Sequence, residues 1–372
     1  MDRLKKIILI CEQFTQSPRW AYKVTLLCLF TSLFLAFPSY ENLDLNGGRL
    51  RVVANQKQDI TSIRNETRAL GNNKLAFRLF VPLTARLLHL NMIGCLVMQF
   101  LAGVILFYLI ARIAEDVTHD RVIAMLTGLA VATIFAGVTS FVDLRGVFDG
   151  IALCLLMAAM WFRSPPLIAL TVFCAAWTDE RAFIASGFLF LWWAMRDSEP
   201  DNLRFTSFFK LRPLAVVAGS AAYLLGRFYV GSKYGLVAQT DGISLTKYLN
   251  NAPMGIWTAL EGAWIPVLLA AYILYREKKW LEGGLYLAVM CALILAAISV
   301  IDMTRSMTYL LPALPISLAV LRSHKRSYDL RFIMLAAAII CILWPTYYAE
   351  GKNTIWWFWP LPMQVLRWVF IK

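Results

Sequence analysis

Apolar stretches of about 13–21 residues, each bounded by charged residues or proline, recur along the chain and constrain its fold more than any other feature. An α-helix needs roughly 20 apolar residues to cross the hydrocarbon core of a bilayer, so repeated stretches of this kind are typical of transmembrane helices. Charged residues make up only 16% of the 372 positions, whereas a soluble domain carries roughly 25%. The sequence therefore predicts an all-α, polytopic transmembrane helix bundle.

The predicted bundle has eleven or twelve spans. Eleven of them cover residues 24–39, 91–111, 122–141, 147–162, 166–177, 182–195, 214–230, 255–275, 281–301, 306–321 and 331–345. The tail after Tyr347 is rich in tryptophan and is either a twelfth span or an anchor at the membrane interface. No polar stretch is long enough to build a second core, so we expect residues 1–372 to form a single membrane domain. Two long loops, 40–90 and 231–254, connect spans, and the first is expected to carry interfacial helices.

The segment 166–195 decides the predicted orientation. One long helix would place Arg163 and Arg196 on opposite sides of the membrane, whereas two short helices keep both on the side of the N-terminus. Positively charged loops favour the cytoplasmic side, so we predict two helices and a cytoplasmic N-terminus, with loops 40–90 and 231–254 outside. The net charge of +13 is explained by basic inner loops that meet anionic lipid, and nucleic acid is not an expected partner.

Three short turns on the predicted outer face each combine a carboxylate with an arginine. Ionisable groups at membrane depth cost several kcal/mol, so they are usually functional or paired with one another. The helices that flank the turn 179–181 have only about 12–14 residues, which places this turn below the outer surface, in a recessed cavity. Structural ion pairs that fix the helix hairpins are the alternative for each turn. The turns supply the carboxylates Asp143, Asp149, Asp179, Glu180 and Asp302, and the arginines Arg145, Arg181 and Arg305.

The two long outer loops add further candidates. The first contains the carboxylates Glu41, Asp44 and Asp59 ahead of an apolar, basic segment with Arg78, and the second contains Lys233. A lone carboxylate in a polar loop is usually only solvated, but Asp59 precedes a segment that we expect to lie flat on the membrane. The sequence has no GxxxxGKS, GxxxxGKT, HExxH or GxSxG motif and its three histidines are isolated, which argues against P-loop, zinc-protease and serine-hydrolase chemistry.

The layout of these residues resembles the GT-C superfamily of polytopic glycosyltransferases, specifically its compact bacterial branch that uses lipid-linked sugars. The first outer loop carries a carboxylate, here Asp59, and is followed by an Arg-x-x-x-Pro segment, here 78–82. An Asp-Gly pair, here 149–150, opens the fourth span, and an acidic–basic turn, here 179–181, follows the fifth. The resemblance covers most of the chain, although each motif is short. It implies a GT-C-like fold.

The resemblance also implies an activity. The chain would move a sugar, with inversion, from a polyprenyl-phosphate donor to a glycan, lipid or protein acceptor on the extracytoplasmic face of a bacterial inner membrane. A first-loop carboxylate would be the general base on the acceptor hydroxyl. Asp59 is the first candidate for it, and Asp44 and Glu41 stay open because many relatives place an aspartate nearer the end of the first span. The phosphate-binding candidates are Arg78, Arg145, Arg181, Lys233 and Arg305. The residues that would orient the acceptor or a divalent metal, Mg²⁺ or Mn²⁺, are Asp143, Asp149, Asp179, Glu180 and Asp302.

Two other functions fit a polytopic protein with charges on its outer face. A transporter or flippase of a lipid-linked or anionic substrate should show internal repeats and broken helices that meet at the membrane midplane. We find no convincing repeat in the sequence. A polysaccharide polymerase or ligase would also use arginine for diphosphate, but such enzymes usually rely on a large late outer loop, whereas here the largest outer loop is the first.

Overall fold

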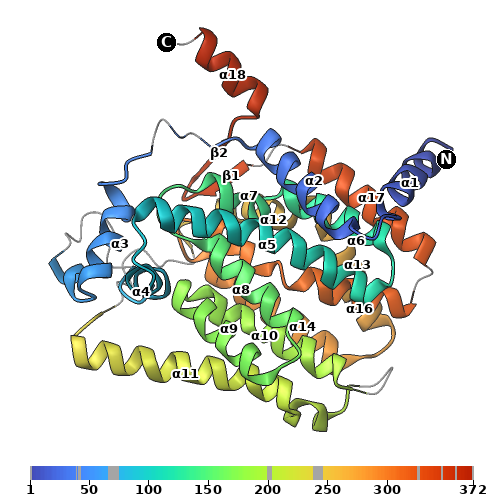
Figure 1. The fold of residues 1–372 in the computed structure, drawn as a ribbon. Helices are drawn as coiled ribbons and strands as arrows, with labels where there is room; N and C mark the ends of the chain where they lie inside the picture. Colours follow the sequence, from blue (N-terminus) through green and yellow to red (C-terminus); the bar gives the residue numbers. More distant parts are fainter. Residues whose placement is uncertain are drawn as a thin grey trace.

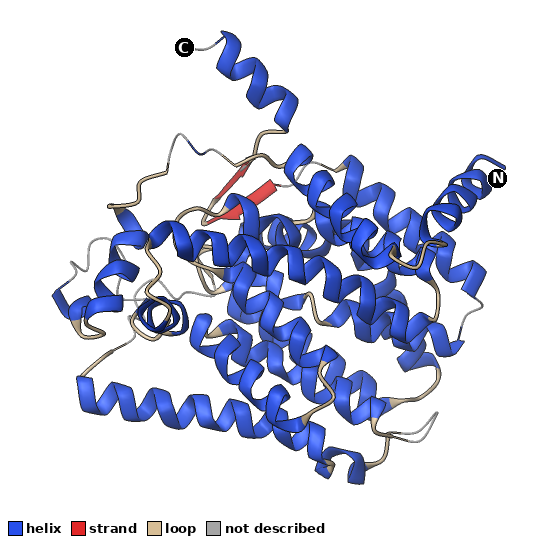
Figure 2. Ribbon diagram, viewed as in Figure 1, coloured by secondary structure: helices blue, strands red, loops and turns tan. Residues whose placement is uncertain are grey.

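The computed structural model describes residues 2–38, 40, 43–65, 75–198, 203–237, 246–324, 327–344, 347–356 and 358–370. It is 79% helical and nearly all-α, which confirms the predicted fold class at that level (Figures 1 and 2). The strands described are β1 (Tyr347–Glu350) and β2 (Asn353–Trp356), an antiparallel hairpin in the tail that was predicted to be an anchor or a twelfth span.

The helices of the bundle follow the predicted spans. They are α2 (Trp20–Leu35), α5 (Met92–Thr118), α6 (Arg121–Thr133), α7 (Phe135–Val142), α8 (Asp149–Trp161), α9 (Pro165–Thr178), α10 (Arg181–Arg196), α11 (Leu211–Tyr234), α12 (Ala252–Leu260), α13 (Trp264–Arg276), α14 (Trp280–Ile298), α15 (Met303–Met307), α16 (Ala313–His324) and α17 (Ser327–Leu343). The predicted division of segment 166–195 is confirmed, because α9 ends at Thr178 and α10 begins at Arg181. Peripheral helices are α1 (Asp2–Thr15), α3 (Gly48–Gln58), α4 (Phe80–Leu87) and α18 (Leu361–Phe370).

Three predicted spans are not continuous helices. The span 122–141 bends by 57° between α6 and α7. The span 255–275 is interrupted by the short 3-10 helix η7 (Glu261–Ala263), and the span 306–321 by η8 (Thr308–Leu310). Pro312 explains the last break, since proline has no backbone N–H and its ring clashes with the preceding turn.

The number of helices long enough to span a membrane is smaller than predicted. By length and composition, four helical segments of the described chain qualify: α5, α11, 249–276 and α14. The bent pair α6–α7 raises the number to five. The other predicted spans correspond to shorter helices, such as α2, α8 and α9, with 16, 13 and 14 residues. The structure therefore bears out several membrane-compatible helices rather than the full set of eleven or twelve.

Apolar side chains point outward along the helices at the surface of the bundle. On α5, Ile93, Val97, Leu101 and Ile105 recur at every fourth position and are 50–54% exposed. A helix at the surface of a soluble protein turns polar residues to the solvent. An exposed apolar stripe of this kind is instead the surface expected to contact lipid tails, which supports an integral membrane protein.

The helices of the first long loop gather at one end of the bundle. Figure 1 shows α3 and α4 at the left, beside the end of α11, whereas the N-terminus and α1 lie at the right. The buried side chains of Leu50, Val52 and Val53 attach α3 to the bundle. This end of the molecule also carries the turns before α8 and between α9 and α10, so the first loop and the charged turns lie at the same end.

Candidate functional site

Two of the predicted outer turns share one local structure, an Asp-x-Arg clamp. Oδ1 of Asp143 accepts hydrogen bonds from the backbone N and the Nε of Arg145, both at 3.1 Å, and Oδ2 accepts from Nη2 at 3.0 Å. Asp179 holds Arg181 in the same way, at 3.0, 2.6 and 2.5 Å. Each buried aspartate therefore fixes the guanidinium two residues later in the two-pronged geometry that is strongest for arginine and carboxylate.

Four segments that are far apart in the sequence meet at the Asp179–Arg181 clamp. Arg305 of α15 contacts both Oδ atoms of Asp149 and lies 3.3 Å from Oδ2 of Asp179. Nη2 of Arg181 lies 3.2 Å from Oδ1 of Asp149, and Nη1 of Arg78 lies 2.8 Å from Oδ2 of Asp179. We call these five residues, Arg78, Asp149, Asp179, Arg181 and Arg305, the charge cluster.

Polar side chains complete the buried side of the charge cluster. The hydroxyl of Tyr309 donates to Oδ1 of Asp149 at 3.1 Å, and Nη1 of Arg181 donates to Oγ of Ser306 at 2.7 Å. The Arg181 guanidinium also lies 5.1 Å from the centre of the Tyr309 ring, within range of a cation–π interaction. Both cluster aspartates have side chains that are 0% exposed, so their charges are met by protein groups rather than by solvent.

The sequence around Asp149 explains how α8 reaches the cluster. Asp149 is the first residue of α8, where the positive end of the helix dipole favours a carboxylate. A Cβ atom at Gly150 would lie 2.0 Å from Oγ of Ser140, so only glycine lets α8 pack this closely on α7. The Asp-Gly pair singled out in the sequence therefore has a structural reason at both positions.

The outer edge of the charge cluster is partly open. Arg78 makes a second two-pronged contact with Glu180, Nε to Oε2 at 3.2 Å and Nη2 to Oε1 at 3.0 Å. The Glu180 side chain is 42% exposed, whereas that of Arg78 is 11% exposed. The Arg78–Asp179 contact is an ion pair without hydrogen-bond alignment, because Nη1 has no hydrogen-bond partner among the described residues. The guanidinium group of Arg78 therefore makes its hydrogen bonds chiefly with Glu180, a carboxylate at the surface.

A second part of the edge is formed by Asp302, Arg49 and the Asp143–Arg145 clamp. Asp302 lies 3.3 Å from Nη1 of Arg305 and 3.9 Å from Nη2 of Arg49. The side chains of Arg49 and Arg145 are 34% and 35% exposed. The buried Asp143 and the partly buried Asp302 therefore lie beside arginines that reach the surface.

The arginines determine the protonation of the turn carboxylates. Burial acts to raise the pKa of Asp143, Asp179 and Asp302, but the neighbouring guanidinium groups outweigh it and hold each pKa below its usual value of 3.8. These carboxylates are ionised at neutral pH. A general base works best with a pKa near the operating pH, so these three groups are better suited to positioning arginines than to taking a proton.

The predicted first-loop bases lie apart from these contacts. Asp59 is exposed, and its carboxylate accepts from the backbone N and Oγ1 of Thr61 at 2.8 and 2.6 Å. Asp44 is exposed and accepts from the backbone N of Asn46 at 3.1 Å. Both aspartates thus stabilise local turns. Glu41 lies outside the described residues. The choice of base stays a prediction.

The remaining predicted phosphate ligand, Lys233, lies at the end of α11. It is exposed, its Nζ is 3.0 Å from Oη of Tyr229, and it lies 5.5 Å from the Tyr234 ring centre.

Sequence reasoning missed Arg49, Ser306 and Tyr309. Tyr309 follows Arg305 by four residues, one helical turn, and that spacing was a usable signal.

The donor set of the charge cluster does not fit the predicted divalent metal. Mg²⁺ prefers carboxylate and water oxygens in octahedral geometry, and here the carboxylates are separated and occupied by guanidinium groups. Within the described ranges, no three His, Cys, Asp or Glu side chains form a group that could hold a metal ion.

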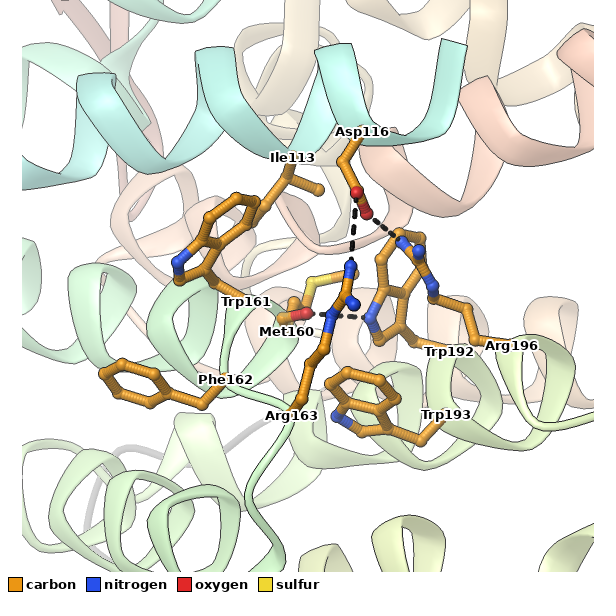
Figure 3. A pocket seen from close by; sticks show the side chains of 9 residues that line it. All are labelled: Ile113, Asp116, Met160, Trp161, Phe162, Arg163, Trp192, Trp193 and Arg196. Atoms are coloured by element: carbon orange, nitrogen blue, oxygen red, sulfur yellow. Dashed lines mark hydrogen bonds and ion pairs between the residues drawn. The ribbon is translucent and has the colours of Figure 1, made fainter. Parts of the chain in front are cut away.

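A cavity lies at the opposite end of the bundle, beside the C-terminal ends of α8, at Trp161, and of α10, at Arg196. Its volume is about 310 Å³. Arg163 and Arg196 converge on Asp116, at 3.5 and 2.7 Å, between the rings of Trp161 and Trp192 (Figure 3). In the turn 179–181, predicted to line a recessed cavity, Asp179 is buried beneath Arg181, whereas Glu180 is 42% exposed.

The sequence matches no family model, and no curated protein or solved structure matches it significantly. The functional assignment therefore depends on the geometry of the charge cluster and its edge.

Proposed function

We propose that the protein is a membrane glycosyltransferase that moves a sugar from a polyprenyl-phosphate donor to an acceptor on the extracytoplasmic face of a bacterial inner membrane. The N-terminus is placed in the cytoplasm and the charge cluster near the outer face. A GT-C-like architecture of eleven or twelve spans, with shorter helices tilted or recessed, belongs to the same proposal. The observation that carries it is the convergence of the first-loop segment and all three charged turns into one site.

The guanidinium group of Arg78 is the proposed phosphate ligand. A guanidinium binds carboxylate and phosphate with the same two-pronged geometry. Glu180, which holds this guanidinium group at 3.0 and 3.2 Å, is 42% exposed and can turn into solvent. A donor phosphate would take its place, and Arg78 would remain anchored through Asp179 on its other side.

The chemistry requires stabilisation of a departing phosphate. In the proposed step the acceptor oxygen attacks the anomeric carbon, the bond from that carbon to the phosphate oxygen breaks, and polyprenyl phosphate leaves with the electron pair. A first-loop carboxylate, Asp59, Asp44 or Glu41, takes the acceptor proton. Arg78, with Arg49 and Arg145 at the open edge, faces the charge that develops on the leaving group, and such preorganised cations lower the barrier. The ionised aspartates beneath them keep the guanidinium groups in position.

Transfer from a panel of polyprenyl-phosphate sugars by the purified protein in lipid vesicles tests this proposal. Asp59→Asn, Asp44→Asn and Glu41→Gln are assayed singly, and loss of the true general base should lower the rate by about 10²–10⁴-fold. Asp329→Asn, an exposed carboxylate on α17 at the end of the bundle away from the cluster, is the control and should keep full activity. Full activity in all three variants would rule out Asp59, Asp44 and Glu41 as the general base.

A transporter of an anionic lipid-linked substrate is the second candidate. The observation that favours it is the interruption of the span 249–276 at η7, because broken helices within the membrane are common in transporters. Vesicles loaded with a polyprenyl-phosphate sugar separate the two functions. Movement of intact donor across the bilayer without sugar transfer supports the transporter, and sugar transfer without donor movement supports the enzyme.

A further inference from the structure

The break between α12 and α13 is imposed by the packing around it. Glu261, its first residue, has φ +47° and ψ −121°, a conformation that favours glycine and is strained in any other residue. A Cβ atom at Gly262 would lie 2.3 Å from the carbonyl oxygen of Ala337, so the break is pressed against the backbone of α17. Strain of this kind persists only where the surrounding packing imposes it.

The backbone groups that the break exposes are bonded. Nε1 of Trp264 on α13 donates to the carbonyl oxygen of Ile256 on α12 at 2.7 Å. The backbone N–H of Glu261 donates to the carbonyl oxygen of Trp257, and Sγ of Cys341 lies 3.7 Å from that of Leu260. These bonds satisfy polar groups that would otherwise be costly at membrane depth.

The Glu261 side chain is the exception. It is 0% exposed, and neither of its carboxyl oxygens has a hydrogen-bond partner among the described residues. Cys341 of α17 is a titratable group beside the break, since its Sγ lies near the carbonyl oxygen of Leu260. The charged residues of the helices packed against the break lie away from it: Arg121 begins α6, Arg276 ends α13, and Asp329 and Arg331 lie in the first two turns of α17. α12 carries none.

We propose that Glu261 is a proton-binding site within the membrane, and that its proton exchange is coupled to opening of the break. An ionised carboxylate without a partner is too costly to keep in such surroundings, so the side chain carries a proton in this conformation. Release of the proton requires water or a cation to reach the carboxyl group. Cys341 lines a cavity of about 160 Å³ with Thr133 and Trp344, and its Sγ lies 3.7 Å from the carbonyl oxygen of Leu260, so the break borders a space that water can enter.

α12 also connects the break to α15, the helix that holds Arg305. Oγ1 of Thr258, one turn before Glu261, lies 2.9 Å from Oγ1 of Thr304. Thr304 precedes Arg305 in α15 and accepts a hydrogen bond from the backbone N of Ala349 at 2.8 Å. A shift of α12 on proton release would therefore act on the helix that holds Arg305. The proton site stands independently of the proposed transferase activity.

Infrared spectroscopy of the full-length protein in lipid vesicles tests the proton site. The wild type should show the C=O band of a protonated carboxyl group at neutral pH, the band should shift in D₂O, and it should disappear as the pH is raised. E261Q should lack the band. E282Q is the matched control, because Glu282 is also buried but accepts a hydrogen bond from the backbone N of Leu203 at 3.2 Å; this variant should keep the band.

A band that E261Q leaves unchanged would overturn the proposal, as would a band that neither shifts in D₂O nor titrates. If E261Q does not fold, the wild type supplies the test through modification by dicyclohexylcarbodiimide, which enters membranes and reacts with protonated carboxyl groups. Peptide mass mapping should find Glu261 modified at neutral pH and progressively less at alkaline pH. Absence of modification at every pH, or modification that does not change with pH, would contradict the proton site.

Discussion

The charge cluster and the break at Glu261 both contain fully buried carboxyl groups. Those of the cluster are paired with arginines, whereas that of Glu261 has no hydrogen-bond partner among the described residues. Asp149 is 0% exposed and is held by two arginines and a tyrosine hydroxyl. Glu261 is also 0% exposed, yet its oxygens have no hydrogen-bond partner in the part of the chain that is described. A buried charge is tolerated when it is paired and bonded, and a buried carboxyl group without partners is tolerated when it is neutral. The first arrangement holds charged groups in place, and the second is the one that we propose stores a proton.

The largest effect is expected from Asp149→Ala. This change leaves Asp179 as the one buried carboxylate of the charge cluster for the guanidinium groups of Arg181 and Arg305, and breaking a buried ion pair by removing one partner costs about 3–5 kcal/mol. Chemical unfolding in detergent should show a loss of stability of that order, or the variant should fail to accumulate. The control, Asp329→Ala, removes an exposed carboxylate and should change stability by less than about 0.5 kcal/mol. Equal stability of the two variants would contradict the importance of the cluster.

The second largest effect is expected from acid pH, which should lower the free energy of unfolding. The turn carboxylates Asp143, Asp179 and Asp302 have pKa values below the usual 3.8, because neighbouring guanidinium groups favour their ionised form, so the unfolded chain binds protons more readily than the folded chain. The stability they contribute is fully present above about pH 4, and it is lost as the pH falls toward the lowered pKa values of the folded state. Unfolding measured from pH 7 downward should show a plateau and then a decline below pH 4. A decline that begins near pH 6 would mean that these carboxylates are not paired as described.

A smaller effect is expected from Arg181→Lys. Lysine keeps the charge but cannot reproduce the two-pronged contact with Asp179 or the bond to Ser306. We expect a loss of about 1–3 kcal/mol in the free energy of unfolding. Arg163→Lys, at the exposed opposite end, is the matched control. If both substitutions cost the same, the clamp geometry adds nothing beyond charge.

The smallest effect on stability is expected from Glu261→Gln. The amide has nearly the shape of the protonated carboxyl group and is also neutral, so stability at neutral pH should change by less than about 1 kcal/mol. The same exchange at Asp149, Asp149→Asn, removes a paired charge and should cost several-fold more. Thermal unfolding of the two variants side by side measures this contrast. A large loss in Glu261→Gln would show that Glu261 is ionised and paired.

The sequence predicted the charged turns well because their signal is local. An Asp-x-Arg turn between two apolar helices contains both partners of its own clamp, as Asp143 and Asp179 show. The sequence also predicted that the three turns lie close together, because it placed all of them on the outer face of the membrane. Arg49 was missed because its contact with Asp302 joins residues 253 positions apart, and nothing near it in the sequence marks that partner.

The break at Glu261 was not predicted because packing imposes it. Residues 255–275 form one apolar run that favours a continuous helix. The interruption depends on the close approach of Gly262 to Ala337 and on the bond from Trp264 to Ile256, and both require the folded bundle. The predicted eleven or twelve spans exceed the four or five helical segments that are long and apolar enough to cross a membrane for a related reason, since an apolar stretch of 13–16 residues looks alike whether its helix crosses the membrane or is recessed within it.

Binding of a short-chain polyprenyl phosphate to the purified protein tests the central claim most directly. Wild type, Arg78→Gln and the control Arg163→Gln are compared by equilibrium titration at one salt concentration. Loss of a two-pronged, charge-assisted contact is worth about 1.5–3 kcal/mol, so Arg78→Gln should raise Kd by about tenfold or more while Arg163→Gln leaves it unchanged. Equal Kd values for wild type and Arg78→Gln would contradict the assignment of the charge cluster as the phosphate site.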